Sequence, residues 1–310
     1  MSTIRVAVIC VSLAFCAAWS SLSFAATLKP EEVIAKHLEA LGTPQARAAA
    51  KSRVVEGDAH FKTLVGGVGL LDGKAAIVSE DRKLQFMVKF ANTAYGGERF
   101  IFNGDKAQIS ANTAGQVRSS FGEFVYSQDA ILREGLLGGA LSNAWPLLNV
   151  EDRKAKITYE GLKTVDGASV HELRYRPKKG TDLDIQLYFD AETFRHVLTV
   201  YTLTVRPQLA HHDRGINDVS KPSPGSMDSG PQEVSDTSET LNARQQETRY
   251  RIEEKFSNFS QVDGLTLPSH YNIHFTQELG NGSTTAFEWD IASTGIHNNV
   301  TLDPRNFQVK

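Results

Sequence analysis

Apolar and polar residues alternate with a period of two along most of the chain. The clearest runs place an apolar residue at every second position of 84–90, 183–189, 271–275 and 287–291. Successive side chains of a β-strand point to opposite faces, so each run predicts a strand with one buried face. Strands of this kind need a shared interior to bury that face, which restricts the chain to a β-rich sheet fold.

Dipeptides typical of tight turns separate the strand-like runs. Glycine adopts positive φ angles freely and Asn and Asp tolerate them, which is what two-residue hairpin turns require. Successive strands should therefore be hairpin neighbours in an antiparallel sheet. The five dipeptides are Asp72-Gly73, Asn103-Gly104, Asp166-Gly167, Asp263-Gly264 and Asn281-Gly282.

The N-terminus has the organisation of a secretory signal peptide. Arg5 precedes an apolar run, residues 6–18, which is followed by small residues up to Ala26. The apolar run is about 13 residues long, shorter than the roughly 20 that a membrane-spanning helix needs. We expect residues 1–25 to be removed and residues 26–310 to form a single domain that is soluble in the periplasm.

Both cysteines, Cys10 and Cys16, lie in the segment expected to be removed. Each follows a large apolar residue, whereas a lipoprotein signal needs a small one, so lipidation is not expected. The mature chain then has no disulfide and no cysteine ligand, and its stability must come from a packed core.

Two segments have helical spacing. Residues 29–42 combine Pro30 in the first turn with a stop at Gly42, which predicts a short helix. Residues 127–142 repeat leucine and isoleucine at helical spacing but contain Gly135, Gly138 and Gly139, so a helix there would need support from packing.

The segment 127–142 and the Trp145-Pro146 that follows it have two interpretations. The first is ordinary core. The second is a loosely packed helix that covers an apolar cavity in a curved sheet and moves aside for a guest. In that case the cover is formed by Leu136, Leu137, Leu141 and Trp145, and the wall by Phe86, Phe90 and Phe102.

Residues 208–245 are rich in Pro, Ser, Gly and Asp and nearly free of large apolar side chains. Such a segment buries too little surface to offset its ordering entropy, which predicts a disordered loop. The strands on either side look like partners in one sheet, so the loop is not expected to be a domain boundary.

Several chemistries find no support in the sequence. With 33 Lys and Arg against 36 Asp and Glu, no basic cluster marks a nucleic-acid partner. Residues 66–74 have the glycine density of a phosphate loop but lack its spacing and its following helix, and are expected to be a bend. His211-His212-Asp213 has no third ligand, and His270 and His274 lie about 13 Å apart along a strand, so no metal is expected.

Catalytic motifs are also missing. There is no nucleophile elbow and no His-Glu-x-x-His motif, and no cofactor is implied. The acids Asp182, Asp184 and Asp190 are best read as the solvated face of a strand. We therefore expect a protein that is not an enzyme, with an unmarked active site as the weakest alternative.

Five segments in the second half of the chain form a pattern of strands and turns, at 166–177, 184–190, 250–259, 262–268 and 299–307. With these segments, roughly residues 150–310 resemble the LolA/LolB-like superfamily of outer-membrane lipoprotein-sorting carriers. The resemblance implies an unclosed β-barrel, in which a strongly curved antiparallel sheet wraps over a few helices and encloses an apolar cavity for acyl chains.

The sequence departs from the carriers in two respects. The resemblance therefore implies membership of the superfamily but does not imply lipoprotein transport itself. The insertion at 208–245 is foreign to the typical carrier, and the buried arginine that latches the carriers' cavity has no clear counterpart in the sequence. The leading hypothesis is a periplasmic binding or carrier protein for a lipid or lipoprotein acyl chain. The alternative is a structural or interaction module whose exposed edge or long loop meets another envelope or outer-membrane protein.

Overall fold

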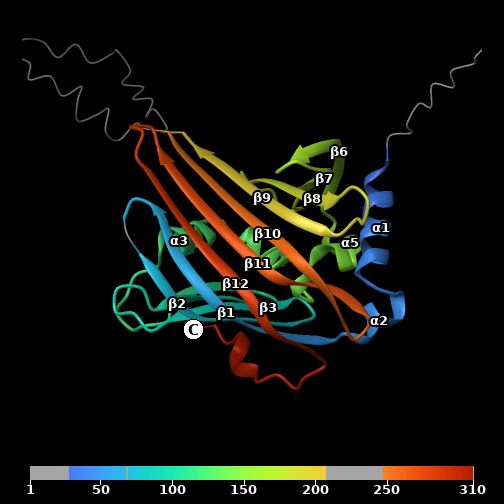
Figure 1. The fold of residues 1–310 in the computed structure, drawn as a ribbon, viewed down its shortest axis with the longest axis horizontal. Helices are drawn as coiled ribbons and strands as arrows, with labels where there is room; N and C mark the ends of the chain where they lie inside the picture. Colours follow the sequence, from blue (N-terminus) through green and yellow to red (C-terminus); the bar gives the residue numbers. More distant parts are fainter. Residues whose placement is uncertain (1–27, 68, 207–246, 310) are drawn as a thin grey trace, which may run out of the picture.

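The computed structural model describes residues 28–67, 69–206 and 247–309 (Figure 1). In these ranges twelve antiparallel strands form one sheet, in the order β5-β4-β3-β2-β1-β12-β11-β10-β9-β8-β7-β6. The edge strands β5 and β6 do not pair with each other, so the sheet is open. The predicted fold class, a mainly β protein with an unclosed, curved antiparallel sheet, is confirmed.

The longest strands are the last three, β10, β11 and β12, with 15 residues each. The strands of the sheet are β1 (Ser52–Val65), β2 (Leu70–Glu80), β3 (Lys83–Phe90), β4 (Gly97–Phe102), β5 (Ala107–Ala111), β6 (Lys156–Val165), β7 (Ala168–Arg176), β8 (Asp184–Asp190), β9 (His196–Val205), β10 (Thr248–Val262), β11 (Leu265–Leu279) and β12 (Thr284–Asn298).

The helices are short and lie at the N-terminus, in the middle of the chain and at its end. They are α1 (Pro30–Leu41), α2 (Pro44–Ala49), α3 (Ser120–Ser127), α4 (Ala130–Arg133) and α5 (Val150–Arg153), with 3₁₀ turns η1 (Gly139–Leu141), η2 (Pro146–Asn149) and η3 (Pro304–Phe307). In Figure 1, α3 and α5 lie behind the face of β9–β12 and α1 runs along one side. None of the helices in these ranges is long and apolar enough to cross a membrane.

Strands β1 and β12, from opposite ends of the chain, pair in the middle of the sheet. Phe61 of β1 lies opposite Trp289 of β12 and opposite Leu71 of β2. On one side of this pair β1–β5 form a meander, and on the other β12–β6 form a second.

The alternation seen in the sequence becomes the two faces of the sheet. Along β11, Tyr271, Ile273 and Phe275 are buried in the main core, while the residues between them are partly exposed. The same main core takes in side chains from both meanders and from α1, α3, α4, η1 and η2. Below, the face that carries this core is called the concave face.

Four of the five turn dipeptides join consecutive strands as predicted. Asp166-Gly167 and Asp263-Gly264, for example, have positive φ at both residues, as the tight turns require. The prediction for Asp72-Gly73 is wrong, because these residues lie inside β2. An added Cβ at Gly73 would come 2.1 Å from the carbonyl oxygen of Lys89, so glycine is needed there for a close approach of two strands.

One of the two helix predictions is confirmed. Residues 29–42 form α1, with Pro30 in its first turn and a backbone N–H of Gly42 closing it on Leu38. The continuous helix predicted for 127–142 is wrong. Within this segment the only α-helix after Ser127 is Ala130–Arg133. Gly135, Gly138 and Gly139 adopt positive φ angles that a right-handed helix cannot include.

Strands β9 and β10 pair directly, with Val205 opposite Thr248. The expectation that the strands before and after the long insertion are sheet partners is therefore confirmed. Residues 207–246 lie outside the described residues, and so do the predicted signal peptide and the His211-His212-Asp213 group.

Candidate functional site

An apolar segment with little regular structure lies on the concave face. We call residues 130–149, which contain α4, η1 and η2, the plug. Its α4 contacts β4, while η1 contacts β9 and β11. The plug therefore spans both meanders and covers the middle of the concave face.

The seven residues predicted to form a cavity all lie in the main core. They are Phe86, Phe90, Phe102, Leu136, Leu137, Leu141 and Trp145, and each is at most 4% exposed. Phe86 and Leu141 line the same small void between plug and sheet, whose volume is about 10 Å³. The space in which a guest was expected is thus filled by the plug itself.

A buried carboxyl group holds the plug at its centre. Glu254 of β10 accepts hydrogen bonds from the hydroxyls of Tyr201 (2.6 Å) and Tyr271 (2.7 Å) and from the backbone N–H of Gly138 (2.8 Å). Burial disfavours the charged carboxylate more than these donors favour it, which raises the pKa of Glu254 to about 7.

Two buried arginines hold the backbone carbonyls of the plug. Arg53 of β1 donates to the carbonyl of Ala140 (2.7 Å) and to the side chain of Asn298 (2.8 Å). Arg153 of α5 donates to the carbonyls of Ala144 (2.7 Å) and Arg133 (3.1 Å). Burial lowers the pKa of Arg53 to about 10, a value at which it still carries its charge at neutral pH.

Two histidines enclose Trp145 at the far end of the plug. The indole N–H of Trp145 donates to Nε2 of His37 (3.2 Å), whose Nδ1 then carries the proton and faces the carbonyl of Phe194 (3.1 Å). The ring of His196 stacks on Trp145 at 4.5 Å between centroids. Burial lowers the pKa of His37 to about 4, so both indole and imidazole are neutral contacts of the core.

One polar atom in this group has no partner. Nδ1 of His196 is buried without a hydrogen bond in the described part of the chain and faces Gly139, where an added Cβ would come within 2.8 Å. Buried polar groups of folded proteins are nearly always hydrogen-bonded. The contact between His196 and the plug therefore leaves one polar group unsatisfied.

Sequence reasoning missed the polar groups that hold the plug, although a signal was present for Glu254, Arg53 and His37. Glu254 alternates with Ile252 and Phe256, and Arg53 alternates with Val55 along an apolar face. His37 falls on the apolar stripe of α1. A charged or polar residue in phase with a buried stripe is the pattern that would have revealed them.

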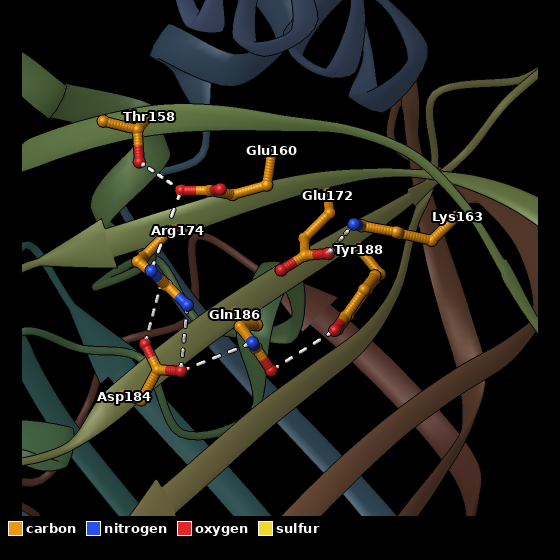
Figure 2. A network of polar contacts seen from close by, with 8 residues as sticks. All are labelled: Thr158, Glu160, Lys163, Glu172, Arg174, Asp184, Gln186 and Tyr188. Carbon is orange, nitrogen blue, oxygen red and sulfur yellow. Dashed lines mark hydrogen bonds and ion pairs between the residues drawn. The ribbon is translucent and has the colours of Figure 1, made fainter.

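The opposite face of the sheet carries a different arrangement (Figure 2). Arg174 of β7 pairs with Asp184 at 2.9 Å and with Glu160 at 3.9 Å, and Lys163 lies 3.8 Å from Glu172. Beside this network is a small apolar cluster of Val170, Tyr188, Leu198 and Val200. Both adjoin the edge strand β6, where Leu162 is 61% exposed.

His270 and His274 on this outer face are paired with acids. Nε2 of His270 lies 2.6 Å from Asp290, and Nδ1 of His274 lies 3.7 Å from Glu253. Among the residues that the structure describes, no three His, Cys, Asp or Glu side chains gather as ligands of a metal ion.

Comparison with known proteins finds similar solved structures but no matching family model and no matching curated protein. A LolA superfamily protein from Nitrosomonas europaea is 12% identical, with 91% of this chain and 98% of that chain covered and a TM-score of 0.43. A DUF1329 family protein from Desulfovibrio piger is 11% identical over 90% and 96%, with a TM-score of 0.38.

A third similar structure is an outer membrane lipoprotein-sorting protein domain from Vibrio parahaemolyticus. It is 10% identical, with 88% of this chain and 97% of that chain covered and a TM-score of 0.35.

Proposed function

We propose that this chain is a non-catalytic binding or carrier protein of a bacterial periplasm, and that it shelters a lipid or lipoprotein acyl chain in the place of the plug. The observation that carries the proposal is how the plug is held. Glu254, Arg53, Arg153 and Ser79 all bind its backbone, at Gly138, Ala140, Ala144 and Asn143. The plug is held by the sheet and by α5 without being part of the sheet.

The free energy that holds the plug and the free energy that an acyl chain gains on burial are of similar size. Each anchoring hydrogen bond contributes about 0.5–1.5 kcal/mol, with more for those of charged groups. An acyl chain gains about 0.8 kcal/mol for each methylene it buries. A guest with about ten buried methylenes could therefore offset the loss of the anchors and part of the plug's own burial, provided that the displaced leucines find new cover.

Two further features support a plug that can move. Gly135, Gly138 and Gly139 interrupt it with positive φ angles, so it has no continuous helix to unfold. Nδ1 of His196 makes no hydrogen bond to the plug, so His196 loses no hydrogen bond at this atom when the plug moves away. Conformational steps of covering segments commonly control access to an interior site.

The test replaces Leu137 by Glu and measures acyl-chain binding. A carboxylate desolvated without a partner costs several kcal/mol while the plug is in place, and it regains water when the plug leaves, so the affinity for palmitate or a lysophospholipid should rise at least tenfold. Tryptophan emission serves as the readout, because displacement of the plug would take Trp145 away from His37 and His196. Trp289 contacts other rings, those of Phe61, Phe121 and Phe287, and reports on the sheet.

Leu162→Glu is the matched control, since it makes the same change at an exposed position of β6. It should bind like the wild type, and circular dichroism should show both variants folded. Lipid extraction and mass spectrometry of the purified wild type should find co-purified lipid. No bound lipid, together with no emission change on titrating the delipidated wild type, would count against the proposal.

The second candidate function is a non-catalytic structural or interaction module of the envelope. The observation in its favour is β6, an edge strand with one open hydrogen-bonding side next to the apolar cluster of Val170 and Tyr188. An extended segment of a partner could add to such an edge. A photo-crosslinker at Leu162 that captures one defined envelope protein, in a chain that retains no lipid, would favour this function instead.

A further inference from the structure

A second hollow opens beside the plug, at the end of β1 near α2. Its volume is about 360 Å³. Its apolar walls are formed by Leu41, Leu148 and Leu265, and its plug side includes Asn143. Below, this hollow is called the mouth pocket.

The mouth pocket has an excess of positive charge. Arg47, Lys51 and Arg53 line it, against the single acid Asp81. Within the described ranges no carboxylate lies in ion-pairing distance of any of the three cations. The guanidinium of Arg53 is the most unusual of them, because it is only 3% exposed and its bonds go to neutral groups, Ala140 and Asn298.

A buried cation without an anion is costly, and removing a charge from water is normally offset by a partner of opposite sign. The bond of Arg53 to the carbonyl of Ala140 satisfies one of its donors but does not neutralise it. Should the plug leave, this donor would lose its acceptor. An anion entering the mouth pocket would then supply both the hydrogen bond and the missing charge.

The plug itself borders the pocket, through Asn143 and Leu148. Asn143 forms part of the pocket wall, while its backbone N–H binds Ser79 and its side chain binds the carbonyl of Ala50. Ala140, held by Arg53, is next to Leu141, which faces the void beside Phe86. A charged group in the pocket could therefore be attached to an apolar chain lying in the plug's place.

We infer that the mouth pocket is a site for the anionic head group of the guest, with Arg53, Lys51 and Arg47 as its cations. This inference rests on the proposed function and narrows it. The ligand class is an amphiphile with one acyl chain and a carboxylate or phosphate head, and a neutral lipid with the same chain binds less well.

The experiment compares three ligands that share a palmitoyl chain: palmitate, lysophosphatidate and the neutral monopalmitoylglycerol. Delipidated protein is titrated at pH 8 by calorimetry, with inorganic phosphate alone as a head-only probe. Both anions should bind at least tenfold more tightly than the neutral lipid. Whichever of palmitate and lysophosphatidate binds more tightly shows whether the site prefers a fatty-acid carboxylate or a phospholipid phosphate. Salt at 0.5 M should reduce the preference for each anion over the neutral lipid.

Lys51→Glu is the variant of choice, because Arg53 also holds the plug and its loss would affect the fold. Lys51 is exposed, and its hydrogen bond to the side chain of Asn299 is made by its backbone N–H. Reversing its charge should weaken both anions about tenfold and leave the neutral lipid unchanged. Lys62→Glu, on the outer side of β1, the strand that begins directly after Lys51, is the control and should change none of the three.

The outcomes separate this inference from the function on which it rests. Equal binding of anionic and neutral lipids would overturn the head-group site and leave the acyl-chain site standing. Equal effects of Lys51→Glu and Lys62→Glu would also overturn it, since the preference would then come from overall charge. If none of the three lipids binds, both the proposed function and this inference fail.

Discussion

At the scale of single residues, the pH dependence of this protein should be governed in part by Glu254. A glutamate in the unfolded chain titrates near 4.5, whereas burial raises the pKa of Glu254 to about 7. Between these values the folded chain keeps a proton that the unfolded chain has lost. The contribution of Glu254 to the free energy of unfolding therefore falls as the pH rises from about 4.5 to 7, and it is constant above pH 7.

Glu254→Gln tests this directly. An amide at this position can still accept from Tyr271 and Gly138 and can donate to Tyr201, while it never ionises. Relative to the wild type, the variant should gain about 3 kcal/mol of unfolding free energy between pH 4.5 and pH 8, the equivalent of the pKa difference. Urea denaturation at a series of pH values measures it.

The neighbouring Glu253→Gln variant provides the control. Glu253 points to the outer face, and its hydrogen bond from His274 lowers its pKa to about 2. Removing this group should cost stability above pH 4.5 instead of adding it, with the opposite trend in pH. A parallel response of the two variants would show that Glu254 is not the group responsible.

The position of Glu254 could have been predicted from the sequence, but its environment could not. Its phase with Ile252 and Phe256 is local information. Tyr201 and Tyr271, which supply its donors, are 53 and 17 residues away along the chain. Which tyrosines meet one carboxylate depends on the order and register of β9, β10 and β11, and residue spacing does not determine these.

At the scale of elements, the plug illustrates how backbone geometry overrides side-chain periodicity. The leucine spacing of residues 127–142 is helical, yet the chain turns at each of its glycines. At Gly135 an added Cβ would lie 2.1 Å from the carbonyl oxygen of Ala144. The apolar residues were correctly expected to be buried, because burial requires only that they face the core, whereas a helix also requires every φ to be negative.

Gly135→Ala should therefore destabilise the protein through two effects, a positive φ and a clash. Gly115→Ala separates them, since Gly115 also has positive φ (+82°) but nothing lies within 4 Å of its added Cβ. We expect a loss of about 1 kcal/mol for Gly115→Ala and of about 3 kcal/mol or more for Gly135→Ala. Thermal unfolding measures both. Equal losses would mean that the plug yields at this point without resistance.

At the scale of the whole molecule, the sheet should tolerate removal of the long insertion. Val205 and Thr248 face each other across the β9–β10 pair, so a short linker can join the two strands. Replacing residues 212–242 by four glycine and serine residues should change the melting temperature by less than about 4 °C, equivalent to about 1 kcal/mol for a chain of this size. A loss of more than about 10 °C would show that the insertion contributes to the fold.

The fold class was predictable because its evidence is repeated many times along the chain. Runs such as Leu84–Phe90 and Leu183–Phe189 alternate, and turns such as Asp263-Gly264 join neighbouring strands. The pairing of β1 with β12 is different, because it occurs once and between residues far apart. No local pattern marks two strands as partners across the length of a chain, so the middle of the sheet had to come from the structure.

This central pairing has a consequence for how the chain acquires its shape. Arg53 meets Asn298 and Phe61 meets Trp289, so the seam between the two meanders can close only after the last strand is available. Contacts of such long sequence separation carry a large loop-closure cost and slow folding. During synthesis the two halves would remain separate sheets, each with an unpaired inner edge, until the C-terminal strand emerged and joined them.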